Sequence, residues 1–122
     1  MSRAVNIMIQ NESDYEAVKA TLQALFPVQF HGFKDRLDKF QFRVLDSDFF
    51  LFIDRELEDD QGLPLSKYNV HVDIYKNPRR SEDEYLLMYQ QMTKYVAKRL
   101  AENVSSSVLV LDNLQIKIAE FN

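Results

Sequence analysis

Alternation of apolar and polar residues is the feature of this sequence that most constrains its fold. Residues 4–10, 39–45 and 68–76 all alternate with a period of two. Successive side chains of a β-strand point to opposite sides of the sheet, so each stretch predicts a half-buried strand. Residues 49–53 are continuously apolar, as in a central strand that is covered on both faces. Three further strands are predicted over residues 28–34, 107–111 and 114–121.

Two other stretches have the 3.6-residue period of an amphipathic helix. The first begins at Ser13, because Ser13 and Glu16 have the spacing of a capping box. It ends just before Pro27, which disfavours helical geometry in the preceding residue. The second helix is expected to run from a similar motif at Ser81 to about Asn103.

The expected element order is therefore β-α-β-β-β-β-α-β-β. Two helices with one apolar face each need a surface to cover, and a sheet of neighbouring strands supplies it. We therefore expect a two-layer α+β fold, with a mostly antiparallel sheet and two helices on one face. The chain has 122 residues without a repeat, linker or low-complexity tract, which predicts a single domain over residues 1–122.

Composition excludes several classes of protein. The absence of Cys excludes disulfides, thiol nucleophiles and cysteine-based metal sites. No apolar run approaches the roughly 20 residues of a membrane-spanning helix, and the first residues lack a secretion signal. We therefore expect a cytoplasmic protein with no membrane partner. The net charge of −4 argues against nucleic acid as a partner, because binding to phosphates needs a basic surface.

Negative charge is concentrated between residues 46 and 60, where seven acids stand against one base, a local net charge of −6. The acids are Asp46, Asp48, Asp54, Glu56, Glu58, Asp59 and Asp60. A solvated strand end and loop would give the same cluster. The functional alternative is a surface that steers a basic protein partner. Phe49 and Phe50 lie in the same stretch and are candidate apolar anchors for that partner.

Groups with catalytic chemistry are few. His71 and Asp73 lie two residues apart in a predicted strand, so they share a face and could form an acid–base pair or bind a metal. A solvated strand face explains them more simply, and no further ligand has suitable spacing. Lys76, Arg79 and Arg80 precede the second helix and could bind an anion with its free amides, although a charged loop explains them too. No cofactor motif is present, and we expect a non-catalytic protein without a cofactor.

The chain resembles the small immunity proteins of bacterial toxin–immunity systems, such as contact-dependent growth inhibition. The resemblance covers the whole short, acidic, cysteine-free chain and is carried by FFLFIDRELEDD, SEDEYLLMYQQMTKYVAKRLAEN and VLVLDNLQIKIAEF. It implies that the protein binds a cognate toxin domain, often a basic nuclease, and blocks its active or substrate-binding surface. No motif defines these proteins, so no site residue is carried over from them.

Two alternatives stay open from the sequence. Secretion chaperones of the type III kind are similarly small and acidic, but they usually begin with a helix, whereas a strand is predicted first here. A small hydrolase or metal-dependent enzyme would use His71 and Asp73.

Overall fold

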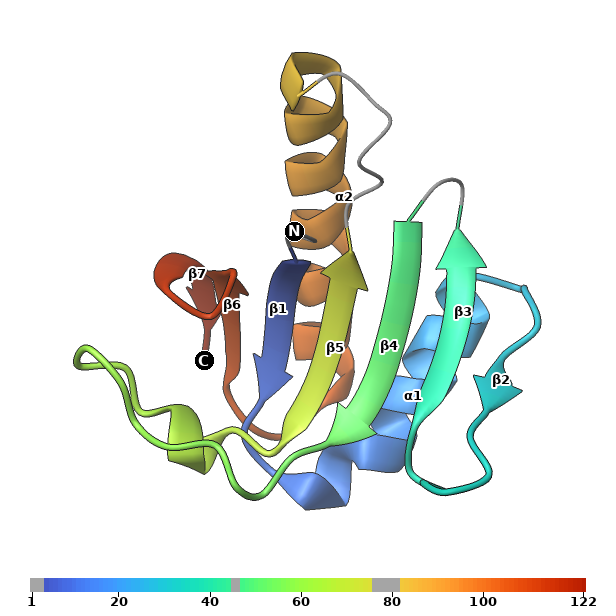
Figure 1. Ribbon diagram of the computed structural model, residues 1–122, viewed down its shortest axis with the longest axis horizontal. Coiled ribbons are helices and arrows are strands. Elements are labelled where there is room, and N and C mark those ends of the chain that lie inside the picture. The colour runs from blue at the N-terminus through green and yellow to red at the C-terminus, as the bar shows by residue number, and fades with distance from the viewer. Residues whose placement is uncertain (1–3, 45–46, 76–81) are drawn as a thin grey trace.

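The computed structural model describes the backbone of residues 4–44, 47–75 and 82–122, and their side chains except those of 82–88. Within these residues seven strands form one antiparallel sheet in the order β2-β3-β4-β5-β1-β6-β7 (Figure 1). The strands are β1 (Ala4–Ile9), β2 (His31–Gly32), β3 (Phe40–Val44), β4 (Ser47–Ile53), β5 (Val70–Tyr75), β6 (Val108–Asp112) and β7 (Ile116–Phe121). The helices are α1 (Tyr15–Leu25) and α2 (Glu82–Asn103), with short 3-10 turns η1 (Glu12–Asp14) and η2 (Leu65–Lys67).

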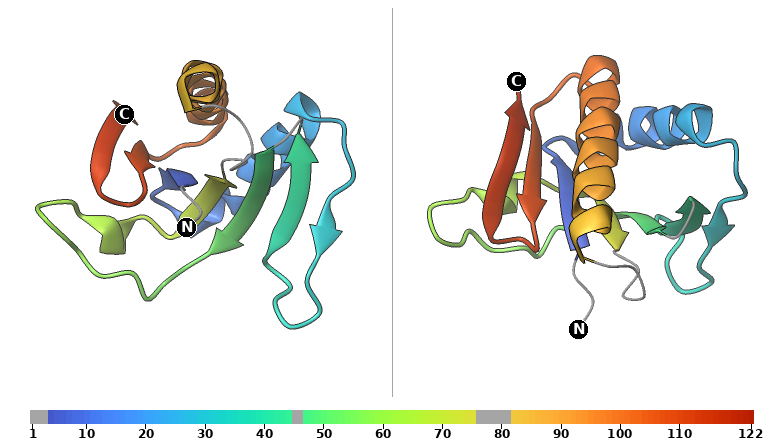
Figure 2. Two further views of the ribbon diagram at one scale, coloured as in Figure 1. Left: turned by 45° about the horizontal axis from the view of Figure 1, so that its top comes forward. Right: turned by 90° about the horizontal axis from the view of Figure 1, so that it is seen from above.

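The predicted fold class is confirmed. Both helices lie on the same side of the sheet, which we call the helix face (Figure 2). The opposite side is called the second face, and Figure 1 looks onto it with the helices behind the strands. No helix in the described parts of the chain is long and apolar enough to cross a membrane.

Strand β1 lies in the interior of the sheet, although it comes first in the chain. It pairs with β5 on one side and β6 on the other, so that Ile7 lies opposite both Val72 and Val110. Every residue of β1 is buried. The strand therefore needs apolar cover on both faces, and two different parts of the chain provide it.

The main core lies between the sheet and the helices. Alternate residues of each strand point to the helix face, as the period of two predicts. They meet Val18 and Leu22 from α1 and Val96 and Leu100 from α2, all of which are fully buried. Burying a side chain of this size stabilises the fold by roughly 1.5–3 kcal/mol.

A smaller apolar cluster covers part of the second face. Met8 of β1 and Leu109 and Leu111 of β6 pack there against Leu65 and Tyr68. These two residues belong to the long connection between β4 and β5. The connection thus covers the β1–β6 side of the second face, whereas the β4–β5 side is not part of this cluster.

The first helix starts differently from the prediction and ends where expected. Asn11 caps η1, its Oδ1 accepting from the Ser13 amide at 3.2 Å, and α1 begins only at Tyr15. The predicted capping box of Ser13 and Glu16 is wrong, because Asn11 already satisfies the Ser13 amide and Ser13 lies within η1, not at the N-cap of α1. The helix ends at Leu25, two residues before Pro27. The similar motif at Ser81 lies outside the described residues.

Two strand predictions need correction. The strand expected over residues 28–34 is reduced to His31–Gly32 at the edge of the sheet. The final hairpin turns at Asn113 and Leu114, both with positive φ (53° and 59°), so β7 begins at Ile116 and not at the predicted residue 114. A positive φ is unfavourable for a bulky residue such as Leu114. Its amide donates to Asn6 Oδ1 at 2.8 Å and its side chain packs on the second-face cluster, and these contacts hold the turn.

Asp14 joins the start of α1 to the connection between α2 and β6. This buried carboxylate accepts from the Ser105 amide and hydroxyl at 3.2 and 3.0 Å, and from the Ser106 hydroxyl at 2.6 Å. Burial raises the pKa of Asp14, but the hydrogen bonds from the two serines outweigh it and lower the pKa below 3.8. The charged form of Asp14 therefore stabilises the fold.

Tyr89 of α2 inserts its hydroxyl between the two central strands. The hydroxyl accepts from the Val5 amide at 2.7 Å and donates to the Ile74 carbonyl at 2.5 Å. Val5 and Ile74 are opposite each other in the β1–β5 pair. One buried side chain thus satisfies a donor and an acceptor at the end of the ladder and fixes α2 to the sheet.

We expect Asp14→Asn to lower the free energy of unfolding by about 1–3 kcal/mol at neutral pH. Because the folded-state pKa of Asp14 is lowered, its stabilisation is present above the unfolded-state pKa and disappears as the pH falls through the folded-state value. Urea unfolding of both proteins at neutral and acidic pH measures this. Glu16→Gln, at an exposed acid of the same helix, is the control. A difference that does not change with pH would contradict a role for the Asp14 charge.

We expect Tyr89→Phe to cost about 1–3 kcal/mol of unfolding free energy, because the buried Val5 amide loses its acceptor. Hydrogen exchange at the Val5 amide should accelerate in the same variant. Tyr95→Phe is the matched control, since Tyr95 lies on the same helix with 57% of its surface exposed. Equal stability of the two variants would show that the Tyr89 hydroxyl contributes nothing.

Candidate functional site

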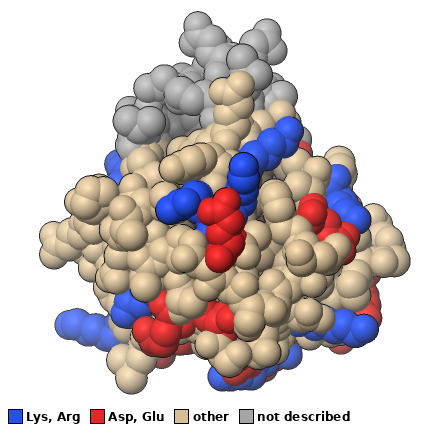
Figure 3. Space-filling view, turned by 180° about the vertical axis from the view of Figure 1, so that it is seen from behind, with Lys and Arg blue, Asp and Glu red and all other residues tan. Residues whose placement is uncertain are grey.

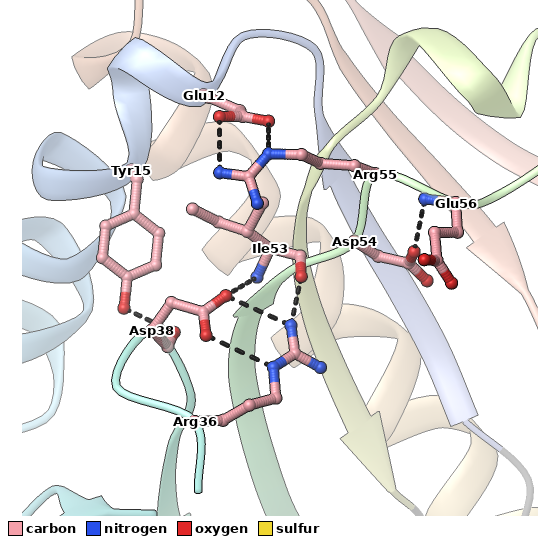
Figure 4. A network of polar contacts seen from close by, with 8 residues as sticks. All are labelled: Glu12, Tyr15, Arg36, Asp38, Ile53, Asp54, Arg55 and Glu56. Atoms are coloured by element: carbon pink, nitrogen blue, oxygen red, sulfur yellow. Dashed lines mark hydrogen bonds and ion pairs between the residues drawn. The ribbon is translucent and has the colours of Figure 1, made fainter.

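The acidic loop, residues 54–60, leaves the end of β4 and is held there by an ion pair. Arg55 binds Glu12 with two contacts, Nε to Oε1 at 2.6 Å and Nη2 to Oε2 at 3.0 Å (Figure 4). The Asp54 amide donates to the Asn69 carbonyl at 2.8 Å, and Asn69 Nδ2 donates to Glu12 Oε1 at 3.4 Å. The first residues of the loop are thus tied to η1 and to the residue before β5.

A second clamp holds the end of β4 itself. Arg36 donates to both carboxylate oxygens of Asp38, at 3.2 and 3.1 Å, and also to the Ile53 carbonyl. The Ile53 amide in turn donates to Asp38 Oδ2 at 3.2 Å, and the Tyr15 hydroxyl donates to the Asp38 carbonyl at 2.6 Å (Figure 4). The Arg36 guanidinium holds the pKa of Asp38 below its usual value, while burial raises the pKa of Tyr15 to about 12.

Three of the predicted partner-binding acids have structural contacts. Asp48 pairs with Arg43 across β3 and β4, with Nε to Oδ1 at 3.0 Å. Asp54 Oδ1 accepts from the Glu56 amide at 2.9 Å. Asp59 Oδ1 accepts from the amide and hydroxyl of Ser66, at 2.9 and 2.7 Å, and these bonds lower the pKa of Asp59. Asp54 and Asp59 therefore shape the loop.

The other acids of the loop point outward. Glu56, Glu58 and Asp60 are exposed, and none of them forms an ion pair within the described parts of the chain. The helix face differs, since basic and acidic side chains lie beside one another there (Figure 3). The acidic loop thus carries exposed negative charges that no basic side chain of the described residues neutralises. Asp46, the remaining predicted acid, lies outside the described residues.

The two predicted aromatic anchors have different positions. Phe49 is fully buried on the helix face, where its ring stacks on Phe42 at 4.7 Å, so it is not available to a partner and that prediction is wrong. Phe50 is half-buried on the second face, with its ring edge on Tyr75 at 5.4 Å. The predicted anion-binding residues Lys76, Arg79 and Arg80 lie outside the described residues.

His71 and Asp73 share the second face as predicted, but both are buried (3% and 8% exposed), not solvated. His71 Nε2 lies 3.0 Å from the Tyr68 carbonyl. Asp73 Oδ1 accepts from Asn6 Nδ2 at 2.9 Å. Burial raises the pKa of Asp73, and the Asn6 hydrogen bond only partly offsets this. The expected solvated face is wrong because Tyr68 of the β4–β5 connection lies against His71, while Asn6 and Phe50 of the neighbouring strands flank Asp73.

Aromatic rings and cations lie beside Asp73 on the same face. Phe50 lies directly opposite Asp73 in the β4–β5 pair, and Phe52 lies opposite His71. The Lys39 ammonium sits 5.4 Å from the Phe50 ring centre, 5.7 Å from that of Phe52 and 4.9 Å from that of Phe33. The residues that precede β3 thus bring positive charge onto the second face.

Sequence reasoning missed Asn6, Phe33 and Lys39 as members of this cluster. Asn6 offered one signal, since an amide in an otherwise apolar central strand must find buried hydrogen-bond partners. Phe33 and Lys39 offered none, because their places depend on how a loop folds over the sheet.

Metal binding would need more ligands than this face offers. Among the residues that the structure describes, no group of three or more His, Asp or Glu side chains is placed to hold a metal ion. The arrangement of charged and aromatic groups is instead suited to binding cations.

Comparison with known proteins gave no relative. The sequence matches no family model, and neither a curated protein nor a solved structure matches it.

We expect Asp73→Asn to raise the free energy of unfolding at neutral pH, because a buried amide avoids the cost of burying a charge. The folded-state pKa of Asp73 is raised, so the protonated form of Asp73 favours the native state. This stabilisation is fully present below the unfolded-state pKa and is lost as the pH rises through the folded-state pKa. The gap between variant and parent should therefore widen from acidic to neutral pH in denaturant titrations. Asp60→Asn, at an exposed acid, should show no such trend. A less stable Asp73→Asn protein at neutral pH would contradict the expectation.

Proposed function

We propose that this protein is a non-catalytic binding module that neutralises a cognate toxin domain with a basic surface. It would act as an immunity protein in the cytoplasm, covering the active or substrate-binding surface of a nuclease-like toxin. The observation that carries the proposal is the acidic loop, whose outward carboxylates are exposed while its remaining acids hold its shape.

The anchoring of the loop matters for binding. Arg55 fixes one end of the loop through Glu12, and Asp59 fixes the other through Ser66. A loop that already has its bound shape loses less conformational freedom when a partner docks. Its outward carboxylates also attract a basic protein over distance, which raises the association rate. Both effects favour a surface for protein recognition.

The test is the rate of association with a cognate toxic domain, which we would first seek in the reading frame next to this gene. We expect Glu58→Lys with Asp60→Lys to slow association roughly tenfold at low ionic strength. Added salt should shrink the difference, because salt screens exposed charges that are more than about 10 Å apart at about 0.1 M ionic strength. Stopped-flow fluorescence over a series of salt concentrations measures both effects. Asp59 is kept, because its reversal would disturb the loop through Ser66.

The matched control is Glu16→Lys with Glu102→Lys, which changes the net charge by the same amount. Glu16 and Glu102 are exposed on α1 and α2 and do not belong to the acidic loop. The control should slow association much less. Equal slowing by both double variants would mean that net charge alone steers the encounter. Absence of any complex between the parent protein and the toxic domain would overturn the proposed function.

A further inference from the structure

The β4–β5 side of the second face combines a buried carboxylate with aromatic rings. Asp73 is 8% exposed, and only its Oδ1 accepts a hydrogen bond from the residues that the structure describes. No described side-chain oxygen is both fully buried and without a partner, so Asp73 Oδ2 keeps some access to solvent. Phe50 stands next to it across the strand pair. A donor that reached this face could therefore bind Oδ2.

The protein's own cations show what these rings accept. The Lys39 ammonium lies within 6 Å of three phenyl rings, and the Arg36 guanidinium carbon lies 5.5 Å from the Phe52 ring centre. A cation at this distance from a ring centre is attracted by the electron-rich ring face. Arg36 is fixed by Asp38 and Ile53. Lys39, in contrast, forms no ion pair within the described parts of the chain.

We propose that Asp73 and the rings of Phe50 and Phe52 receive an arginine side chain of the basic partner, which takes the place of Lys39. A guanidinium suits this site better than an ammonium, because its plane stacks on a ring while its N–H groups donate to a carboxylate. The inference rests on the proposed function, since it names the contact that the basic partner would make. It also places that contact on the sheet, separate from the acidic loop.

The choice of residue at position 73 supports this assignment. Asparagine could accept the same hydrogen bond from Asn6 without the cost of a buried charge. An acid that is less favourable for stability than its neutral isostere is typical of a functional site. Burial raises the pKa of Asp73, and the charge of Lys39 offsets part of this effect. An incoming arginine would supply the same positive charge at closer range.

The experiment uses the full chain and a defined probe, N-acetyl-arginine amide, titrated into labelled protein and followed by NMR. We expect the Phe50 and Phe52 ring signals and the Asp73 carboxyl signal to shift together. Lys39→Met should tighten probe binding roughly 2- to 5-fold, because the competing cation is removed. Asp73→Asn should weaken it about tenfold or more, because a charge-assisted bond is lost.

Two controls keep the inference falsifiable. Lys34→Met removes an exposed lysine from the same connection and should leave probe affinity unchanged. Phe52→Leu removes an aromatic ring of the site and leaves Asp73 in place, so it should also weaken probe binding. This variant tests the site independently of any change in stability that Asp73→Asn causes. Shifts confined to the acidic loop, or equal affinity of the parent, Lys39→Met and Asp73→Asn proteins, would overturn the inference.

The same variants separate this inference from the proposed function. Toxin binding that is equal in the parent and Asp73→Asn proteins would overturn the arginine site and leave the proposed function standing. Probe binding at Asp73 without any complex between the protein and the toxic domain would overturn the proposed function and leave a site for arginine side chains standing.

Discussion

Two-sided burial of β1 is the constraint on which the rest of this structure depends. The strand lies in the interior of the sheet, with a neighbour on each side, and all of its residues are buried. Helices α1 and α2 cover one face, and the connection between β4 and β5 covers part of the other. Asn6, the one polar side chain of this strand, then joins Asp73 to the turn at Leu114. One strand thus contributes to the main core and, through Asn6, to the hydrogen bonds of the second face.

Local patterns predicted the fold class because the spacing of apolar residues shows which face of a strand or helix is buried. The period of two identified the strand positions, and Pro27 marked the end of α1. Sheet order and the cover of the second face depend on contacts between distant residues, which spacing does not encode. His71 and Asp73 therefore looked like a solvated strand face, whereas both are buried. The predicted start of α1 was wrong for a local reason, since Asn11 caps η1 and α1 begins only at Tyr15.

The acidic segment shows the same limit at the level of single side chains. The sequence predicted the charge, but acids of one type have different roles according to what lies within reach. Asp59 is bound by Ser66 and shapes the loop, whereas its neighbours Glu58 and Asp60 are exposed. Phe49 and Phe50 divide in the same way, one into the core and one onto the second face. Neighbouring residues of a strand point to opposite faces, and the position of the helices decided which of the two rings was buried.

The position of β1 in the sheet also determines when this strand can fold during synthesis of the protein. Asn6 is 67 residues from Asp73 and 108 from Leu114, yet it bonds to both. During translation the apolar side chains of β1 therefore stay unprotected until β5 and β6, its two neighbours in the sheet, have left the ribosome. Sheets closed by such distant pairs fold slowly, and their unfinished forms are prone to aggregate. Early binding of this segment by a chaperone would protect the nascent chain.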